Sequence, residues 1–532
     1  MTMPVSNWSE WSQPSIEPFM EAVIHLASGD VHLTDNEISH INITARMFDS
    51  SYILFGPPEP ATATLEIIDF EQAYNPVLNT DLVENVRIDF YLGLWPGDMS
   101  SAEVGENLVD SFDQPILVDY LGDECWATVI RITPEYLVPL RRYRLEYSYA
   151  ESGSTDVRTE SFIVPSDWFE RHIYAIVRPD QYQVVDVKIY EVQALLQPYG
   201  VFFAQEWAYD TISHTASVDL IDSMNEALSL DNRASAALPA ENILLEAFTE
   251  QFLQLYDGDT ALIRDYSSGT LQSFNPLLRY SFYESDQATT VNKLVEALAA
   301  CYFFLPDGSA ALCHPTGAYL TDISVTDDDV ESYDISQTSA YAYDSISVDY
   351  NATKLAQQTL KTVEDYAVDS NDQVLLFDTA RVFKVDYLQY TAYSGDAPNP
   401  IFYDWHCAGV FDLRALNANP TWKELSAVGQ VVESTTQRYS GIEGVSGYEI
   451  SDNMYIQNAT HAQVLYDVLD NFRQESYNTV MITLRGCSAF WPGAIISLTS
   501  NLYSIQDEYV IIELSFDYDG AVHTTLTMQK QI

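Results

Sequence analysis

The stretch YGVFFAQEWAYDTISHTASVDLID, residues Tyr199 to Asp222, decides the first part of the fold. Its first half predicts a strand whose alternate side chains share one face, namely Val201, Phe203, Trp207 and Tyr209. Residues 210–214 are polar enough to turn. Apolar residues then alternate again at Ala216, Val218 and Leu220. The whole stretch therefore predicts a β-hairpin, and the pattern changes to helix and loop after Asp222.

Short alternating segments also precede this hairpin, at 22–26, 41–44, 63–68, 86–91 and 184–190. Strands of this length and spacing are typical of a small antiparallel barrel or sandwich. We therefore expect a first barrel-like domain split between residues 21–95 and 175–225, with residues 1–20 as an N-terminal arm.

Residues 102–168 have the pattern of a separate module inserted into that domain. The step L-x-P-x-x-x-Y-x-L, from Leu137 to Leu145, resembles the tyrosine strand of fibronectin type III and immunoglobulin-like β-sandwiches. Insertion of such a module into a surface loop is physically ordinary.

The inserted module also carries the only basic cluster of the chain: Arg131, Arg141, Arg142 and Arg144. One interpretation is that these side chains pair with local acids. The other is that they bind an acidic partner or a cell-surface glycan, because guanidinium groups suit planar anionic ligands.

Beyond residue 225 the apolar spacing becomes helical, which predicts a helical α/β domain over 226–325. One stripe lies within 242–253, and another follows Asp286 at Val291, Leu294, Val295, Leu298 and Ala299. The alternation at 340–350 predicts a second barrel-like region over 326–440. We expect residues 441–532 to close it with a helix at 461–472 and strands at 479–486, 494–498, 508–516 and 522–528.

The net charge of −54 argues against binding to nucleic-acid phosphates and against docking on an anionic membrane. Such an acidic, Lys-poor composition is similar to that of proteins from halophiles, although an acidic protein from an ordinary host also fits. The five Cys residues form no C-x-x-C pair and indicate free thiols. We expect no signal peptide and no membrane span.

A search for catalytic motifs predicts no enzyme. Phosphate-binding glycine loops, H-E-x-x-H and G-x-S-x-G are absent from the sequence, and the nine His residues are dispersed. We therefore expect no catalytic residues, no cofactor and no metal. Two acidic stretches, 327–329 and 369–372, are interpreted as solvated loops in preference to cation sites.

Three features together resemble the tail hub, or baseplate hub, proteins of tailed viruses. The hairpin places Gly200, Phe202, Trp207, Val218, Leu220 and Asp222 where that family has them. A helical domain follows. Near the end, Arg485-Gly486-Cys487 and Trp491-Pro492-Gly493-Ala494 stand at two further family steps, with Ala494 in place of the usual Asp.

This resemblance implies a multidomain, mainly β structural protein of the virion, made in the host cytoplasm and located at the tail tip. It implies a homotrimer whose two barrel-like domains per chain form a pseudo-sixfold ring. Implied partners are a distal tail or tail tube hexamer, the tape-measure protein and tail-tip or fibre proteins, with DNA passing through an acidic lumen. Two alternatives remain open: an adhesin that binds host glycan through 102–168, and a glycan hydrolase with an unrecognised carboxylate pair.

Overall fold

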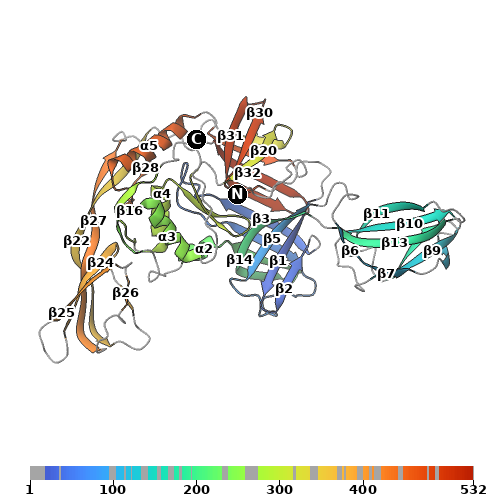
Figure 1. Cartoon of the computed structure of the whole chain (residues 1–532), viewed down its shortest axis with the longest axis horizontal. Helices are drawn as coiled ribbons and strands as arrows, with labels where there is room; N and C mark the ends of the chain where they lie inside the picture. The colour runs from blue at the N-terminus through green and yellow to red at the C-terminus, as the bar shows by residue number, and fades with distance from the viewer. Residues whose placement is uncertain are drawn as a thin grey trace.

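A computed structural model describes most of the chain and is dominated by strands, as expected (Figure 1). Its four described helices are α2 (Met224–Ser229), α3 (Leu245–Asp257), α4 (Gln287–Ala297) and α5 (Ala459–Gln474). The described residues are 18–34, 37–94, 104–112, 116–120, 123–132, 142–151, 157–165, 173–178, 182–192, 195–229, 238–257, 274–284, 286–315, 319–335, 345–367, 374–376, 379–391, 399–406, 410–412, 421–440, 447–475, 478–485 and 490–530.

The largest sheet has 13 strands and occupies the centre of the molecule. Two of them lie off the main path: β30 (Ala494–Ser500), which pairs with β31, and β20 (Tyr319–Thr326), which pairs with β30. The others follow in the order β2 (Gly29–Leu33), β1 (Pro18–Leu26), β5 (Arg87–Leu94), β14 (Leu195–Asp210), β15 (Thr215–Ile221), β4 (Thr62–Ile68), β3 (Ile38–Arg46), β31 (Ile505–Tyr518), β32 (Val522–Lys530), β29 (Thr479–Leu484) and β21 (Val330–Asp334).

This long sheet joins the two ends of the chain. Strands β3 and β31 pair antiparallel, so the N-terminal strands and the C-terminal strands share one hydrogen-bonded surface. The described strands leave the main path open at its two ends, β2 and β21, and the side branch open at β20. None of the described sheets is closed into a barrel. The strands expected for the first barrel-like domain and those expected over 479–528 therefore meet in one open sheet, whereas the described strands between residues 346 and 439 form separate sheets.

The hairpin of β14 and β15 is confirmed, but its core face changes partway along. The register of β14 against β15 shifts between Ala204 and Glu206, which is a β-bulge. Within residues 201–204, just before the bulge, the buried side chains are Phe202 and Ala204, and Val201 and Phe203 are only half-buried. After it, Trp207 and Tyr209 pack against the core. The prediction that Val201, Phe203, Trp207 and Tyr209 share one face is wrong, because the extra residue reverses the alternation.

The inserted module forms a separate lobe of two four-stranded sheets (Figure 1). Pairing places residues 173–192 with this module, because β12 pairs with β9 and β13 pairs with β10. One sheet contains β11 (Val157–Pro165), β10 (Arg142–Glu151), β13 (Tyr182–Val192) and β6 (Val104–Asn107). The other contains β12 (Ile173–Arg178), β9 (Asp123–Ile132), β7 (Val109–Phe112) and β8 (Ile116–Tyr120).

Helices α3 and α4 confirm the helical stripes expected after residue 226. In α3 the buried side chains are Leu245, Phe248, Thr249, Phe252 and Leu253. Helix α4 begins after Asp286, whose carboxylate accepts the Thr289 N–H at 2.7 Å and so satisfies a free N-terminal donor. Four short strands accompany these helices: β16 (Glu241–Leu244), β17 (Leu277–Tyr280), β18 (Cys301–Phe304) and β19 (Ala310–Cys313).

A separate five-stranded sheet extends as an arm on the side opposite the inserted lobe (Figure 1). Helix α5 packs against this arm with Leu465, Val468, Leu469 and Phe472 buried, as its spacing predicts. The arm contains β25 (Asn399–His406), β24 (Val382–Thr391), β27 (Thr421–Tyr439), β22 (Ile346–Ala367) and β28 (Tyr448–Ile450), with β23 (Val374–Leu376) and β26 (Val410–Asp412) paired separately.

Candidate functional site

The strongest candidate surface is the polar face of the long sheet around the β3–β31 pair. On the opposite, core face, Ile43 of β3 lies opposite Phe516 of β31, and both are fully buried. The polar face alternates with it, because successive residues of a strand point to opposite sides. One row of directly opposed residues crosses six strands of this face: Glu206, Asp219, Thr64, Asn42, Asp517 and His523.

Hydroxyl groups and carboxylates dominate this face. Thr64 donates to Asp219 at 3.4 Å, and Thr527 donates to Glu513 at 3.4 Å. Neighbouring rows contain further Ser and Thr side chains at Thr44, Thr62, Ser217, Thr483, Ser515 and Thr525. The face is therefore hydrophilic and carries anionic groups on both halves of the sheet.

Every ionic contact across the β3–β31 pair uses an acid of β31. The His40 Nε2 atom lies 2.7 Å from Asp517 Oδ1, and Asn42 donates to the same oxygen at 3.4 Å. Arg46 donates through Nε and Nη2 to Glu513 at 2.9 and 2.8 Å. Each contact joins one position of β3 to one position of β31, more than 460 residues away in the sequence. Together they favour a single register between the N-terminal and C-terminal strands of the sheet.

The guanidinium group of Arg46 contacts two carboxylates, those of Glu513 and Glu59. Its Nη1 atom donates to Glu59 at 2.7 Å, in addition to the two bonds to Glu513. Burial lowers the pKa of Arg46, but the hydrogen bonds and charges of Glu513 and Glu59 outweigh burial and raise it. One Arg facing two carboxylates leaves a net negative charge at this point of the polar face.

We expect Arg46→Met to lower the free energy of unfolding by about 1–2 kcal/mol, because it leaves two half-buried carboxylates without their donor. Chemical denaturation of the full chain measures this. The matched control is Lys354→Met, which removes the exposed pair with Glu433 and should cost less than about 0.5 kcal/mol. Equal losses in the two variants would contradict a structural role for the Arg46 contacts.

The predicted arginine cluster is divided between two strands. Arg131 lies on β9 of one sheet, Arg142 and Arg144 lie on β10 of the other, and Arg141 lies outside the described residues. Arg144 contacts Glu146 at 2.9 Å and stacks over the Tyr190 ring at 5.4 Å. For Arg144, pairing with a local acid is therefore observed, and binding of a glycan or partner by the cluster stays a prediction.

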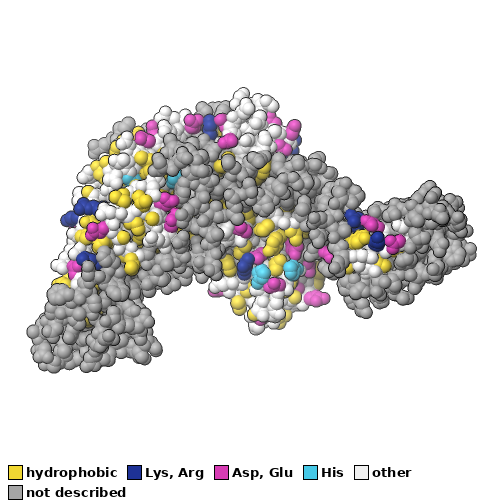
Figure 2. All heavy atoms as spheres, in the orientation of Figure 1, with side chains coloured by type: hydrophobic (Ala, Val, Ile, Leu, Met, Phe, Trp, Pro, Cys, Tyr) yellow, Lys and Arg dark blue, Asp and Glu magenta, His cyan; other side chains and the backbone are white. Residues whose placement is uncertain are grey.

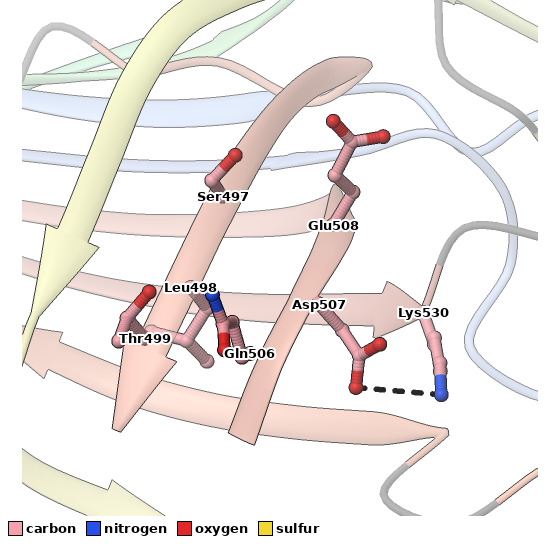
Figure 3. Close-up of a pocket in the computed structure, with 7 residues that line it drawn as sticks. All are labelled: Ser497, Leu498, Thr499, Gln506, Asp507, Glu508 and Lys530. Carbon is pink, nitrogen blue, oxygen red and sulfur yellow. Dashed lines mark ion pairs between the residues drawn. The ribbon is translucent and has the colours of Figure 1, made fainter. Parts of the chain in front are cut away.

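A groove of about 440 Å³ lies beside β30 and β31 (Figure 3). Its lining is Ser497, Leu498, Thr499, Gln506, Asp507, Glu508 and Lys530. Lys530 pairs with Asp507 at 3.4 Å, so one of the two carboxylates in the lining is engaged in an ion pair.

Charge on the rest of the described surface follows the composition. Figure 2 shows Asp and Glu side chains scattered over the described parts of one face, with Lys and Arg in a few small groups. Within the ranges given above, no group of three or more His, Cys, Asp or Glu is arranged to hold a metal ion. The described helices include none that is long and apolar enough to cross a membrane.

Sequence reasoning did not identify the polar face. A signal was present in the alternation of His40, Asn42, Thr44 and Arg46 with apolar residues, and in a similar alternation over 513–517. Each pattern predicts a half-buried strand, but neither indicates which distant strand it pairs with.

Comparison with known proteins gives a fold-level likeness only. No protein-family model matches the sequence. No curated protein matches it either. Among solved structures, the tail protein from Neisseria meningitidis MC58 is similar over 96% of both chains, with 9% identity and a TM-score of 0.38. The prophage MuSo2 43 kDa tail protein from Shewanella oneidensis covers 96% of this chain and 98% of its own, with 8% identity and a TM-score of 0.39.

A prophage tail protein from Listeria monocytogenes EGD-e is similar over 95% of this chain and 94% of its own, with 8% identity and a TM-score of 0.37. Phage tail proteins are thus among the solved structures that this chain resembles. At these values the likeness concerns the general course of the chain and assigns no residue a role.

Proposed function

We propose that this chain is a structural virion protein, a tail hub at the distal tip that assembles as a trimeric ring. The observation that carries the proposal is the single sheet made from both ends of the chain through β3 and β31. Two sheet-built halves in one chain allow three copies to present six similar units. Such a ring would adapt a sixfold tail tube to a threefold tip.

The free edges of the long sheet support ring closure. Strands β2 and β21 are each five residues long and stand at the two ends of the main path. Exposed edges offer unpaired backbone donors and acceptors to another chain. Head-to-tail pairing of unlike edges closes a ring when the rotation between copies is right. In the proposed trimer, β2 of one copy therefore faces β21 of the next.

The polar face of the sheet suits the lumen of such a ring. Its carboxylates, at Asp219, Glu513 and Asp517 among others, would repel the phosphate backbone of passing DNA. Arg46 is bound by two acids and offers no free cation for a phosphate. DNA would then pass without being held. The tape-measure protein would be a further partner in the same lumen.

Mass measurement tests the proposal. We expect the purified chain, alone or mixed with tail tube protein, to give a mass three times that of the monomer by light scattering or native mass spectrometry. Substitutions at exposed positions of both edges, for example His32→Lys with Ser332→Lys, should return it to a monomer that keeps its circular dichroism spectrum. A strict monomer under both conditions would count decisively against the ring.

A further inference from the structure

The long loop between β4 and β5 exposes an unusual number of large apolar side chains. Phe70 is 73% exposed, Val77 86% and Leu78 66%. Ile212, in the adjoining β14–β15 turn, is 90% exposed. Large apolar side chains that are exposed on neighbouring segments of a folded protein commonly mark an interaction site. We call these four residues the loop patch.

The loop and the turn that form the patch are in direct contact. The Asp69 N–H donates to the His214 carbonyl at 2.8 Å, and the Tyr209 hydroxyl donates to the Asp69 carbonyl at 2.8 Å. The rings of Phe70 and His214 lie 5.5 Å apart. The Asp69–Phe70 end of the loop and the turn that carries Ile212 therefore lie side by side at one end of the N-terminal half-sheet.

The loop is also held in one conformation by its own polar groups. The Asp69 carboxylate accepts the N–H groups of Ala73 and Tyr74 at 2.9 and 2.7 Å. The Asn75 side chain accepts the Val77 N–H at 3.0 Å, and Asn79 donates to the Ala73 carbonyl at 2.9 Å. A loop that is ordered before binding loses little conformational entropy when a partner docks, which favours affinity.

The surroundings of the loop patch are acidic. Glu71, Glu84 and Asp210 are exposed, Asp81 is half-exposed, and residues 68–86 contain no Lys, Arg or His. A second copy of this surface would bring like charges together, which disfavours self-association. A surface with apolar side chains surrounded by Lys or Arg would match the patch in both respects.

We propose that the loop patch is a docking surface for a protein partner of that kind: an apolar centre with a basic rim. The proposal goes beyond the ring, because ring closure uses the edges β2 and β21 whereas the patch consists of loops at the strand ends. Its failure and the failure of the ring are therefore distinguishable.

Binding of two labelled synthetic peptides to the full chain tests the proposal. Both peptides carry the same Leu and Phe residues, and one has Lys where the other has Glu. Fluorescence anisotropy at physiological ionic strength measures the binding. We expect saturable binding of the Lys peptide, and binding of the Glu peptide that is at least about tenfold weaker.

The decisive variant is Phe70→Ser with Leu78→Ser and Ile212→Ser, which should weaken the Lys peptide at least about tenfold. The matched control replaces three exposed leucines elsewhere, Leu238, Leu244 and Leu277, with Ser, and should leave binding unchanged. Absence of binding, equal loss in both variants, or equal binding of both peptides would overturn the proposal. So would concentration-dependent self-association that the loop-patch variant abolishes, because the occupant would then be a second copy.

Discussion

Phe516→Ala is expected to lower the free energy of unfolding by about 3–5 kcal/mol, the largest effect of any substitution considered. Phe516 is fully buried on β31, and its ring lies 4.6 Å from that of Tyr199 on β14. Tyr199 in turn meets Trp491 at 5.8 Å, and the Trp491 indole donates to the Phe304 carbonyl at 2.9 Å. Removing the ring leaves a cavity where both halves of the long sheet and strand β18 come together.

The matched control is Phe70→Ala, which removes the same ring from a site that is 73% exposed and should change stability by less than about 0.5 kcal/mol. Urea or guanidinium denaturation of both variants gives the comparison. A loss for Phe516→Ala below about 1 kcal/mol would mean that the junction is not a packed core. If the ring is assembled from intact long sheets, trimer formation should also weaken in this variant.

Glu296→Gln is expected to make the protein more stable at high pH, by an amount that disappears in acid. Glu296 is only 9% exposed on α4, and burial raises its pKa from 4.5 to about 7. Hydrogen bonding from Asn453 to the carboxylate at 2.8 Å and the charge of Lys293 oppose this shift without cancelling it. The folded protein therefore keeps a proton that the unfolded chain releases.

The sign follows from this difference in bound protons. Below about pH 4.5 Glu296 is protonated in both states, and its titration contributes nothing to stability. As the pH rises from about 4.5 to about 7 the stability falls, and above that range the full cost is present. Glutamine carries no charge, so the gain of the variant over the wild type should grow across this window by up to about 3 kcal/mol.

Denaturation of Glu296→Gln and wild type at pH 4, 6 and 8 measures the effect, with pH values chosen around the window. Glu71→Gln on an exposed loop is the control, and its difference from wild type should stay nearly constant. A gain for Glu296→Gln that is the same at every pH would contradict the shifted pKa. Asp222, whose pKa burial also raises to about 7, continues to titrate in the variant, so some pH dependence should remain.

Local elements were predictable because the forces that select them act between near neighbours in sequence. The spacing after Asp286 gave helix α4, and the apolar faces of α3 and α5 were correct to within a few residues. Alternation gave the closing pair β31 and β32, whose turn contains Gly520 at a φ of +97°. By contrast, a single bulged residue near 205 reverses the predicted face of β14. This bulge was not predictable, because one extra residue leaves no mark on composition.

The amino-acid sequence by itself determined the mainly β character of this protein, its helices and its strongly acidic charge, since propensity, periodicity and ionisable side chains are local properties. Only the tertiary structure decided that β3 pairs with β31, that β13 belongs to the inserted lobe, and that the polar faces of two distant segments form one surface. Strand pairing is decided by contacts between residues hundreds of positions apart. Many alternating segments are equally able to pair before the chain folds, so the choice depends on how all of them pack together.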